Sequence, residues 1–287
     1  MCKSSDLIDA MKRGGVILFA GAGLSVPLKL PNWNQLMTHL AHELGFAPEI
    51  FQQSANNMVL AEYYSLMKGP IGPLRGWMDR EWHKNPEKIR ESKAHELITR
   101  LNFPIIYTTN YDRWIEIAFE NAALPFTKIS NVGDIQRIKA GDTQIVKFHG
   151  DFEDDESIVL SESQYFRRLN FEHPLDIKLR GDTLERGVLF IGYSLSDINI
   201  RYLLFKLKEI WSAYGGTQTR PRSYIFLTRP NIVEEKVLEA RGITPIVSGS
   251  DNPSEGLIEF LQSLHDSLHP APGNPSTQPV EGPKSNG

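Results

Sequence analysis

Four short polar clusters each follow a run of apolar residues directly. "ILFA" leads into "GAGLS" from Gly21, "PIIYTT" into Asn110 and Asp112, "QIVKF" into His149, and "VLFIG" into "YSLSD" from Tyr193. Glycine lets a backbone come close to a ligand, while histidine and asparagine can move a proton or orient a reacting group. These residue types suit the cleavage of a bond in a bound, phosphate-bearing molecule.

The apolar runs predict the elements that position these clusters. Runs rich in Ile, Val, Phe and Tyr favour buried strands, and they are "GVILFA", "PIIYTT", "QIVKFH", "SIVLS", "GVLFIG", "SYIFLT" and "TPIVS". Most alternate with helical patterns such as "DRWIEIAFENA", which predicts an α/β fold with a doubly wound, parallel, Rossmann-like sheet. Ligands of such sheets bind beyond the carboxyl ends of the strands, so the clusters should face one crevice.

The chain is predicted to contain an inserted module and a tail. No strand pattern is found over 34–102, where helical segments such as "NQLMTHLAHELG" occur, with Asn32 as a cap and Gly45 as the stop. We therefore expect a Rossmann-like domain over 1–33 and 103–268 and an inserted helical module over 34–102. Residues 269–287 are rich in Pro, Gly and Ser and predict a disordered tail.

Each cluster also has an ordinary structural explanation. The glycines can make a tight turn, Asn110 and Asp112 can cap a helix, His149 can be a core histidine, and Asp197 can cap the next helix. Caps and turns that arise independently would seldom follow successive strands in this order. The combination therefore favours a shared ligand site.

The turn after the first strand has the chemistry of a phosphate site. Gly21 and Gly23 would let backbone N–H groups approach a pyrophosphate, and the hydroxyls of Ser25 and Ser194 would add donors. The turn lacks the GK[ST] sequence that triphosphate hydrolysis needs. Its helix is also delayed to about Asn34, which leaves a longer segment to lie over the ligand.

If NAD is the ligand, Asn110 and His149 could assist the cleavage of its bond between nicotinamide and ribose. Nicotinamide is a cationic leaving group, so cleaving its bond to ribose needs positioning and one base rather than strong acid assistance. A neutral His149 could accept a proton from water or a ribose hydroxyl, and Asn110 could orient that group.

The elements "GAGLS", "TTNYD", "FHGD" and "GYSLSD" together resemble the sirtuin superfamily, whose members bind NAD on a Rossmann fold. The resemblance implies that His149 is the catalytic base and that Asn110 and Asp112 surround the nicotinamide ribose and carboxamide. It implies that Ala22, Gly23 and Ser25 hold a phosphate or ribose of NAD and that Gly192 and Ser194 lie near its phosphates. Gly21 and Asp197 complete the residues that we expect to bind NAD.

The chain departs from the sirtuin pattern at several places, and these differences indicate which group of the superfamily it resembles. Deacylating sirtuins have four zinc-binding cysteines and a peptide-clamping element, whereas this chain has only Cys2, so we expect no metal. With "LPNW", "TTNYD" and "GYSLSD", it more closely resembles prokaryotic sirtuin-like NAD hydrolases of antiphage defence. The alternatives are an NAD-dependent protein deacylase and a non-catalytic module that binds NAD or ADP-ribose.

This resemblance also implies partners. Such domains act as oligomers that deplete NAD on infection, often controlled by another protein. No fused sensor is evident, which suggests self-assembly or a separate regulator such as a HerA-type ATPase or an Argonaute-like protein. Trp77, Met78 and Trp82 in the inserted module are candidates for core or interface positions.

Composition sets the remaining expectations. The net charge of −4 and scattered basic residues disfavour direct nucleic-acid binding. No apolar run approaches the roughly 20 residues of a membrane span, and the amino terminus has no signal-peptide pattern. We therefore expect a soluble, cytoplasmic protein.

Overall fold

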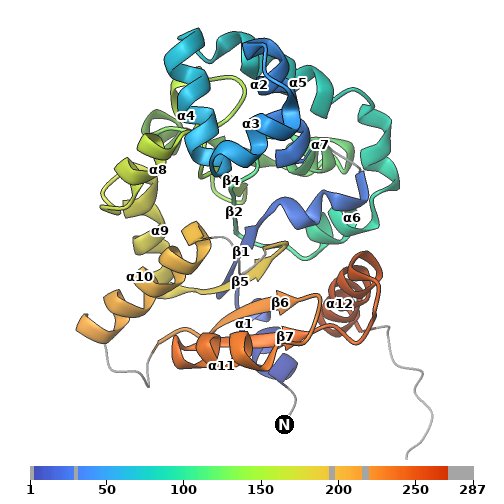
Figure 1. Cartoon of the computed structure of the whole chain (residues 1–287). Coiled ribbons are helices and arrows are strands. Elements are labelled where there is room, and N and C mark those ends of the chain that lie inside the picture. Colours follow the sequence, from blue (N-terminus) through green and yellow to red (C-terminus); the bar gives the residue numbers. More distant parts are fainter. Residues whose placement is uncertain (1–2, 29–31, 194–197, 215–219, 271–287) are drawn as a thin grey trace, which may run out of the picture.

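A parallel sheet of seven strands forms the centre of the computed structural model, which describes residues 3–28, 32–193, 198–214 and 220–270 (Figure 1). The strand order is β3-β4-β2-β1-β5-β6-β7, and every neighbouring pair is parallel. The strands are β1 (Val16–Ala20), β2 (Ile105–Thr108), β3 (Phe126–Ile129), β4 (Thr143–Lys147), β5 (Gly187–Ile191), β6 (Ser223–Leu227) and β7 (Ile243–Val247). The predicted α/β, Rossmann-like fold class is thus confirmed.

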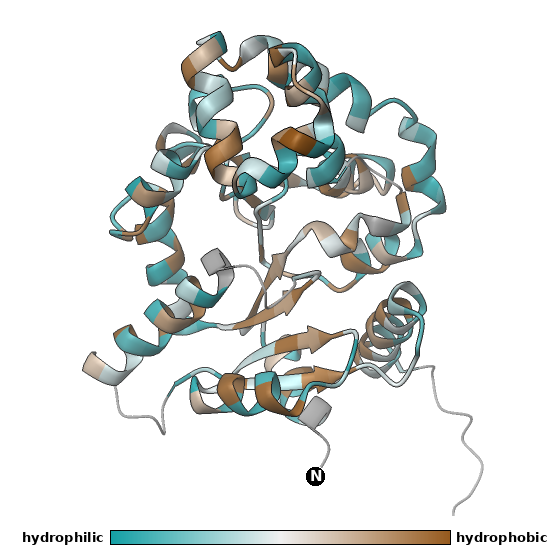
Figure 2. Ribbon diagram, viewed as in Figure 1, coloured by the Kyte–Doolittle hydropathy of each residue, from teal (hydrophilic) through white to brown (hydrophobic). Residues whose placement is uncertain are grey.

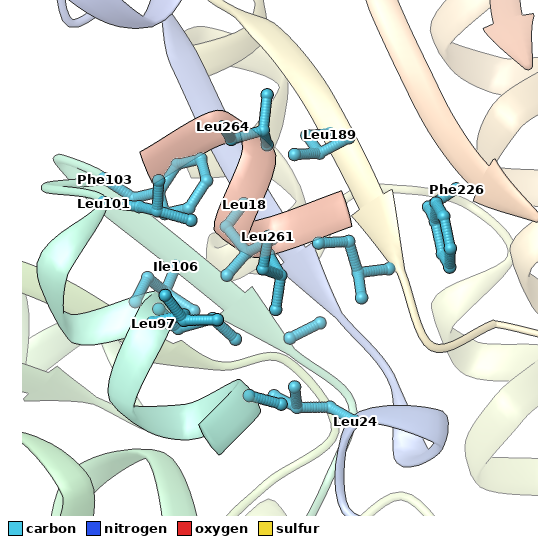
Figure 3. Packing of buried hydrophobic residues seen from close by; sticks show 14 of the residues in the cluster. Leu18, Leu24, Leu97, Leu101, Phe103, Ile106, Leu189, Phe226, Leu261 and Leu264 are labelled. Atoms are coloured by element: carbon cyan, nitrogen blue, oxygen red, sulfur yellow. The ribbon is translucent and has the colours of Figure 1, made fainter. Parts of the chain in front are cut away.

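Helices cover both faces of the sheet because successive strand residues point to opposite sides. Leu18 and Leu189 face one hydrophobic cluster, shown in Figure 3, whereas Ile17 and Phe190 face a second. The first cluster is completed by α1 (Lys3–Lys12), α6 (Lys93–Arg100), α7 (Trp114–Asn121) and α12 (Pro253–Leu268). The second is completed by α9 (Pro174–Glu185), α10 (Ile198–Tyr214) and α11 (Ile232–Ala240). Figure 2 shows the strands as the hydrophobic interior between more polar helices.

The strand predictions are confirmed except at two places. "SIVLS" was expected to be a strand, but Ile158 and Leu160 instead pack into the core of the helical region, and the Val159 N–H donates to the His149 carbonyl at 2.9 Å. This prediction is therefore wrong, because a buried apolar run need not join a sheet. The edge strand β3 was missed because only its alternate residues Thr127 and Ile129 are buried, which breaks the apolar run.

Helices α2 to α5 form the upper part of the molecule in Figure 1. They are α2 (Trp33–Leu44), α3 (Pro48–Ser54), α4 (Asn57–Lys68) and α5 (Gly72–Trp82). Helix α2 begins and ends as predicted, with Asn32 accepting the Gln35 N–H in a capping box and Gly45 in the left-handed conformation. Short 3₁₀ turns at Ala22–Leu24 and Val26–Leu28 precede it, so the expected delay of this helix is confirmed.

The division into a Rossmann-like domain and an inserted module stays a prediction, but the hydrophobic packing can be compared with it. Leu36, Met37 and Met78 belong to a hydrophobic cluster distinct from the two clusters on the sheet faces, whereas Leu97 of α6 packs with the sheet. The sheet thus has α6 as a covering helix, although 34–102 was predicted as one inserted unit. Of the predicted tail over 269–287, only the first two residues lie within the described ranges. No described helix is both long and apolar enough to cross a membrane.

Candidate active site at the carboxyl ends of the strands

The sheet register brings the predicted clusters to one edge. Ala20 of β1 pairs with Thr108 of β2 and with Ile191 of β5, and Thr108 in turn pairs with Lys147 of β4. The glycine loop, Asn110, His149 and Gly192 all follow these paired residues within one or two positions. Strand β1 also lies where the order reverses, with β2 on one side and β5 on the other. This is where open parallel sheets bind ligands.

The turns after β1 and β5 are interlocked through three glycines. A Cβ atom on Gly21 would come within 2.6 Å of the Gly192 carbonyl oxygen, and one on Gly23 within 2.7 Å of the Gly192 Cα. Gly192 has a φ of +76°, and a Cβ there would lie 2.7 Å from the Leu24 nitrogen. No larger side chain fits at these positions without moving backbone.

This interlock engages most N–H groups of the glycine loop. The Gly21 N–H donates to the Ile191 carbonyl at 2.8 Å and the Gly23 N–H to the Gly192 carbonyl at 2.9 Å, while the Ser25 N–H donates to Ala22. The glycines therefore serve packing between the loops, beside any role toward a ligand. Ser25 is 4% exposed, and its hydroxyl has no hydrogen-bond partner among the described residues. A buried, unpaired hydroxyl of this kind is available to a bound molecule.

Asn110 contacts the glycine loop directly. Its side chain is buried, and Nδ2 donates to the Gly21 carbonyl at 3.4 Å. Its own N–H donates to Thr108 Oγ1 at 3.1 Å. Beside it, the Tyr193 hydroxyl lies 3.1 Å from Thr109 Oγ1 and donates to the Ala20 carbonyl at 3.0 Å. The loops after β1, β2 and β5 are thus joined by polar contacts.

The backbone of Asp112 is held in place by a buried lysine. Its carboxylate accepts the Trp114 N–H at 3.1 Å, which caps the start of α7, and its carbonyl accepts a hydrogen bond from Lys147 Nζ. Lys147 is fully buried and also pairs with Glu116 at 3.1 Å. Burial raises the pKa of Asp112, and the Lys147 charge opposes that rise. Asp112 thus accepts the first helical N–H of α7, although the N-cap position itself is occupied by Arg113.

His149 follows β4 and is half-buried. The ring stacks on Phe148 and meets the edge of Tyr165, with centroids 5.7 and 5.2 Å away. Burial, assisted by the positive charge of Arg168, lowers the pKa of His149 to about 3. Arg168 is held in place by two hydrogen bonds to Asp176 and one to the Phe148 carbonyl. The imidazole is consequently neutral at physiological pH.

The predicted site residues can now be compared with the structure. Gly21, Ala22, Gly23, Ser25, Asn110 and Gly192 lie together, and Asp112 and His149 lie on the adjoining loops. Ser194 and Asp197 lie outside the described residues. Among the described residues, no group of three or more His, Cys, Asp or Glu side chains is arranged to hold a metal ion.

Two residues that support the site were missed from the sequence. Lys147 lies in a buried strand. Its position within the apolar run "QIVKF" could have indicated it, because a buried charge needs a partner of opposite charge. Tyr193 was counted only as part of "GYSLSD", and no sequence signal could show that its hydroxyl reaches back to Ala20.

Comparisons with known proteins agree with this architecture. Residues 104–246 match the model of the SIR2-like domain. A protein of Bacillus cereus (strain MSX-D12) named NAD(+) hydrolase ThsA is 31% identical over 75% of this chain and 44% of its own length. Its namesake from Enterococcus faecium is 29% identical over 70% of this chain and 42% of its own length.

A more distant similarity covers more of the chain. The Bacillus subtilis protein named Defense-associated sirtuin 2 is 26% identical over 92% of this chain, which is 26% of that protein. The chain thus spans less than half the length of these relatives. The resemblance to a sirtuin-like family, first suggested by the four motifs, is confirmed.

Substituting one glycine of the interlock should destabilise the protein. We expect Gly23→Ala to lower the free energy of unfolding by about 1–3 kcal/mol, because its Cβ overlaps backbone of the facing turn. Gly181→Ala in α9 is the matched control, since a Cβ there meets nothing within 4 Å. That control should raise stability by about 0.5–1 kcal/mol. Urea unfolding of both variants measures the difference, and equal effects would contradict the interlock.

Stability should fall on acidification partly because of His149. The folded pKa of about 3 lies below the ordinary 6.5, so between these values the unfolded state binds the extra proton. The contribution is complete above pH 6.5 and is lost as pH falls toward 3. Urea unfolding of the wild type and His149→Gln between pH 7 and 4.5 should show the steeper decline in the wild type. Parallel declines would refute the lowered pKa of His149 in the folded protein.

Proposed function

Because the chain is a member of the sirtuin-like family, with a SIR2-like domain over 104–246, we propose that it hydrolyses NAD to nicotinamide and ADP-ribose. The observation that supports this proposal is the contact of Asn110 with the glycine loop, together with a neutral His149 on the turn after β4, the strand that pairs with β2 at the same edge of the sheet. The relatives named NAD(+) hydrolase ThsA support NAD as the substrate and hydrolysis as the reaction.

In the proposed reaction, the oxygen of a water molecule forms a bond to C1′ of the ribose while the bond from C1′ to the nicotinamide nitrogen breaks. The electron pair of that bond returns to the pyridinium ring, so nicotinamide leaves as a neutral molecule. The water loses its proton to solvent, while His149 accepts a hydrogen bond from the attacking water. Little acid assistance is needed because the leaving group is already cationic.

His149 suits the role of a hydrogen-bond acceptor for the attacking water. A general base works best when its pKa is near the working pH. With a pKa of about 3, this imidazole is a weak base at physiological pH. Its neutral form is nevertheless fully populated at pH 7 and can accept a hydrogen bond. We assign to Asn110 the orientation of the water or ribose, since its amide already bridges to the glycine loop.

We assign the remaining predicted residues to binding of NAD. The unpaired hydroxyl of Ser25 is suited to a phosphate or ribose oxygen. Gly21, Ala22, Gly23 and Gly192 belong to the two turns beside which the pyrophosphate would lie. Asp112, Ser194 and Asp197 keep their predicted roles near NAD.

Replacing either central residue should remove the activity. We expect His149→Ala and Asn110→Ala each to reduce nicotinamide release from NAD by about 10²–10⁴-fold, the usual contribution of a positioned proton acceptor. His42→Ala, on the exposed surface of α2, is the control and should retain full activity. The assay is chromatographic detection of nicotinamide.

The same assay separates the competing functions. A deacylase would release nicotinamide only with an acyl-lysine peptide. A binding module would bind NAD by calorimetry without turnover. Undiminished release in both variants would remove the assignment of Asn110 and His149.

We also propose that the chain depletes NAD in antiphage defence as a homo-oligomer, under a separate regulator such as a HerA-type ATPase or an Argonaute-like protein. Met78 is buried, and Trp77 and Trp82 pack against the module core, so these residues serve that core. The apolar side chains left exposed there include Ile50 at 65% and Leu66 at 75%. These are better candidates for self-association.

Light scattering at micromolar concentration tests the oligomer. We expect a mass above that of a monomer, and Leu66→Glu should shift it toward the monomer by placing a charge in the contact. The control Lys68→Glu changes a polar position near the end of the same helix. A wild-type protein that is only monomeric would contradict the proposal.

A further inference from the structure

The loop that carries Asn110 and Asp112 has no regular secondary structure of its own. It covers 109–113, between the end of β2 and the start of α7. Its position must therefore come from contacts with other parts of the chain. Two consecutive residues at the end of α5, Trp82 and His83, supply such contacts.

These two residues contact alternate positions of the loop. The Trp82 ring stacks on Tyr111 with centroids 6.0 Å apart and an interplanar angle of 19°. His83 Nε2 accepts the backbone N–H of Arg113 at 2.9 Å. Asp112 lies between these two contacts, and Asn110 directly precedes them. Figure 1 shows α5 and α7 in the same upper part of the molecule.

The hydrogen bonds of His83 determine its tautomer. A nitrogen that accepts an N–H carries no hydrogen itself, so a neutral His83 has its hydrogen on Nδ1. That hydrogen can be donated to Asp79 Oδ1, which lies 2.8 Å away, four residues earlier in α5. Asp79 also pairs with the guanidinium of Arg113 at 3.3 Å. The arrangement is a relay from Asp79 through His83 to the loop backbone.

The environment of His83 holds its ring in one orientation. The side chain is 8% exposed, and its ring packs near Trp114 and edge-on to Phe152. A ring enclosed in this way cannot turn to offer its other nitrogen without disturbing these neighbours. The acceptor presented to Arg113 is therefore preorganised.

We propose that His83 is a positioning residue for the reaction, acting from the helical region through the Arg113 amide to set the place of Asn110. The inference rests on the proposed NAD hydrolysis. Without the acceptor, the Arg113 N–H is unpaired, and the loop loses a contact three residues from Asn110. Small displacements of an orienting group cost large factors in rate, on the order of 10–100-fold.

Three variants of the full chain test this role. His83→Leu removes the acceptor while keeping an apolar side chain, whereas His83→Gln restores an acceptor at similar reach. His95→Leu is the matched control, because His95 is also a buried histidine of a helix but packs in α6 with Ser92 as its partner. Nicotinamide release gives kcat and KM, and hydrogen exchange followed by NMR gives the protection of the Arg113 amide.

We expect His83→Leu to lower kcat about 10–100-fold with a smaller change in KM, and to speed exchange of the Arg113 amide. His83→Gln should recover most of both properties, and His95→Leu should change neither, even where it lowers stability. Equal kcat in His83→Leu and the wild type, or equal losses in His83→Leu and His95→Leu, would overturn the proposal.

Exchange at Arg113 separates this inference from the proposed function. If the wild type releases no nicotinamide, hydrolysis fails, yet faster Arg113 exchange in His83→Leu and its reversal in His83→Gln would still support the positioning role. Unchanged exchange would refute that role whatever the activity. Should His83→Leu not fold, Asp79→Ala removes the group that selects the tautomer and should accelerate the same amide, with unchanged exchange counting against the relay.

Discussion

The close approach of the turns after β1 and β5 is the constraint on which the rest of the site depends. Gly21, Gly23 and Gly192 let two backbones pass where any Cβ would collide, and the hydrogen bonds across this contact fix both turns. The Gly21 carbonyl then serves as the acceptor for Asn110, while Ala20 accepts from Tyr193. Chain segments far apart in sequence thereby share one rigid edge.

A second constraint is a buried positive charge at the end of β4, which needs a partner of opposite charge. Lys147 is fully buried on β4, and its ammonium group is stabilised by Glu116 and the Asp112 carbonyl. Removing one partner of a buried pair costs about 3–5 kcal/mol, because the other charge is left unpaired. The turn that follows β4 carries His149, so the buried lysine and the neutral imidazole lie two residues apart in the chain.

The helical region and the sheet are not independent bodies. Tyr111, Phe152, Ile158 and Leu160 come from the loops that follow the sheet strands, yet they complete the hydrophobic cluster of helices α2 to α5. The Tyr111 hydroxyl also donates to the Val159 carbonyl at 2.6 Å. A movement of these helices would therefore move the loops that carry the proposed site. A partner or second copy that binds the helices could alter the activity of the site in this way.

Sequence alone determined six of the seven strands, the helix limits at Asn32 and Gly45, and the four polar clusters, because periodicity, capping and strand ends are local properties. Tertiary structure alone decided that "SIVLS" leaves the sheet, since burial there comes from distant helices. It also decided that the glycines pack against Gly192 and that Lys147 and His83 brace the loop around Asp112. Such contacts join residues widely separated along the chain, and no local pattern encodes them.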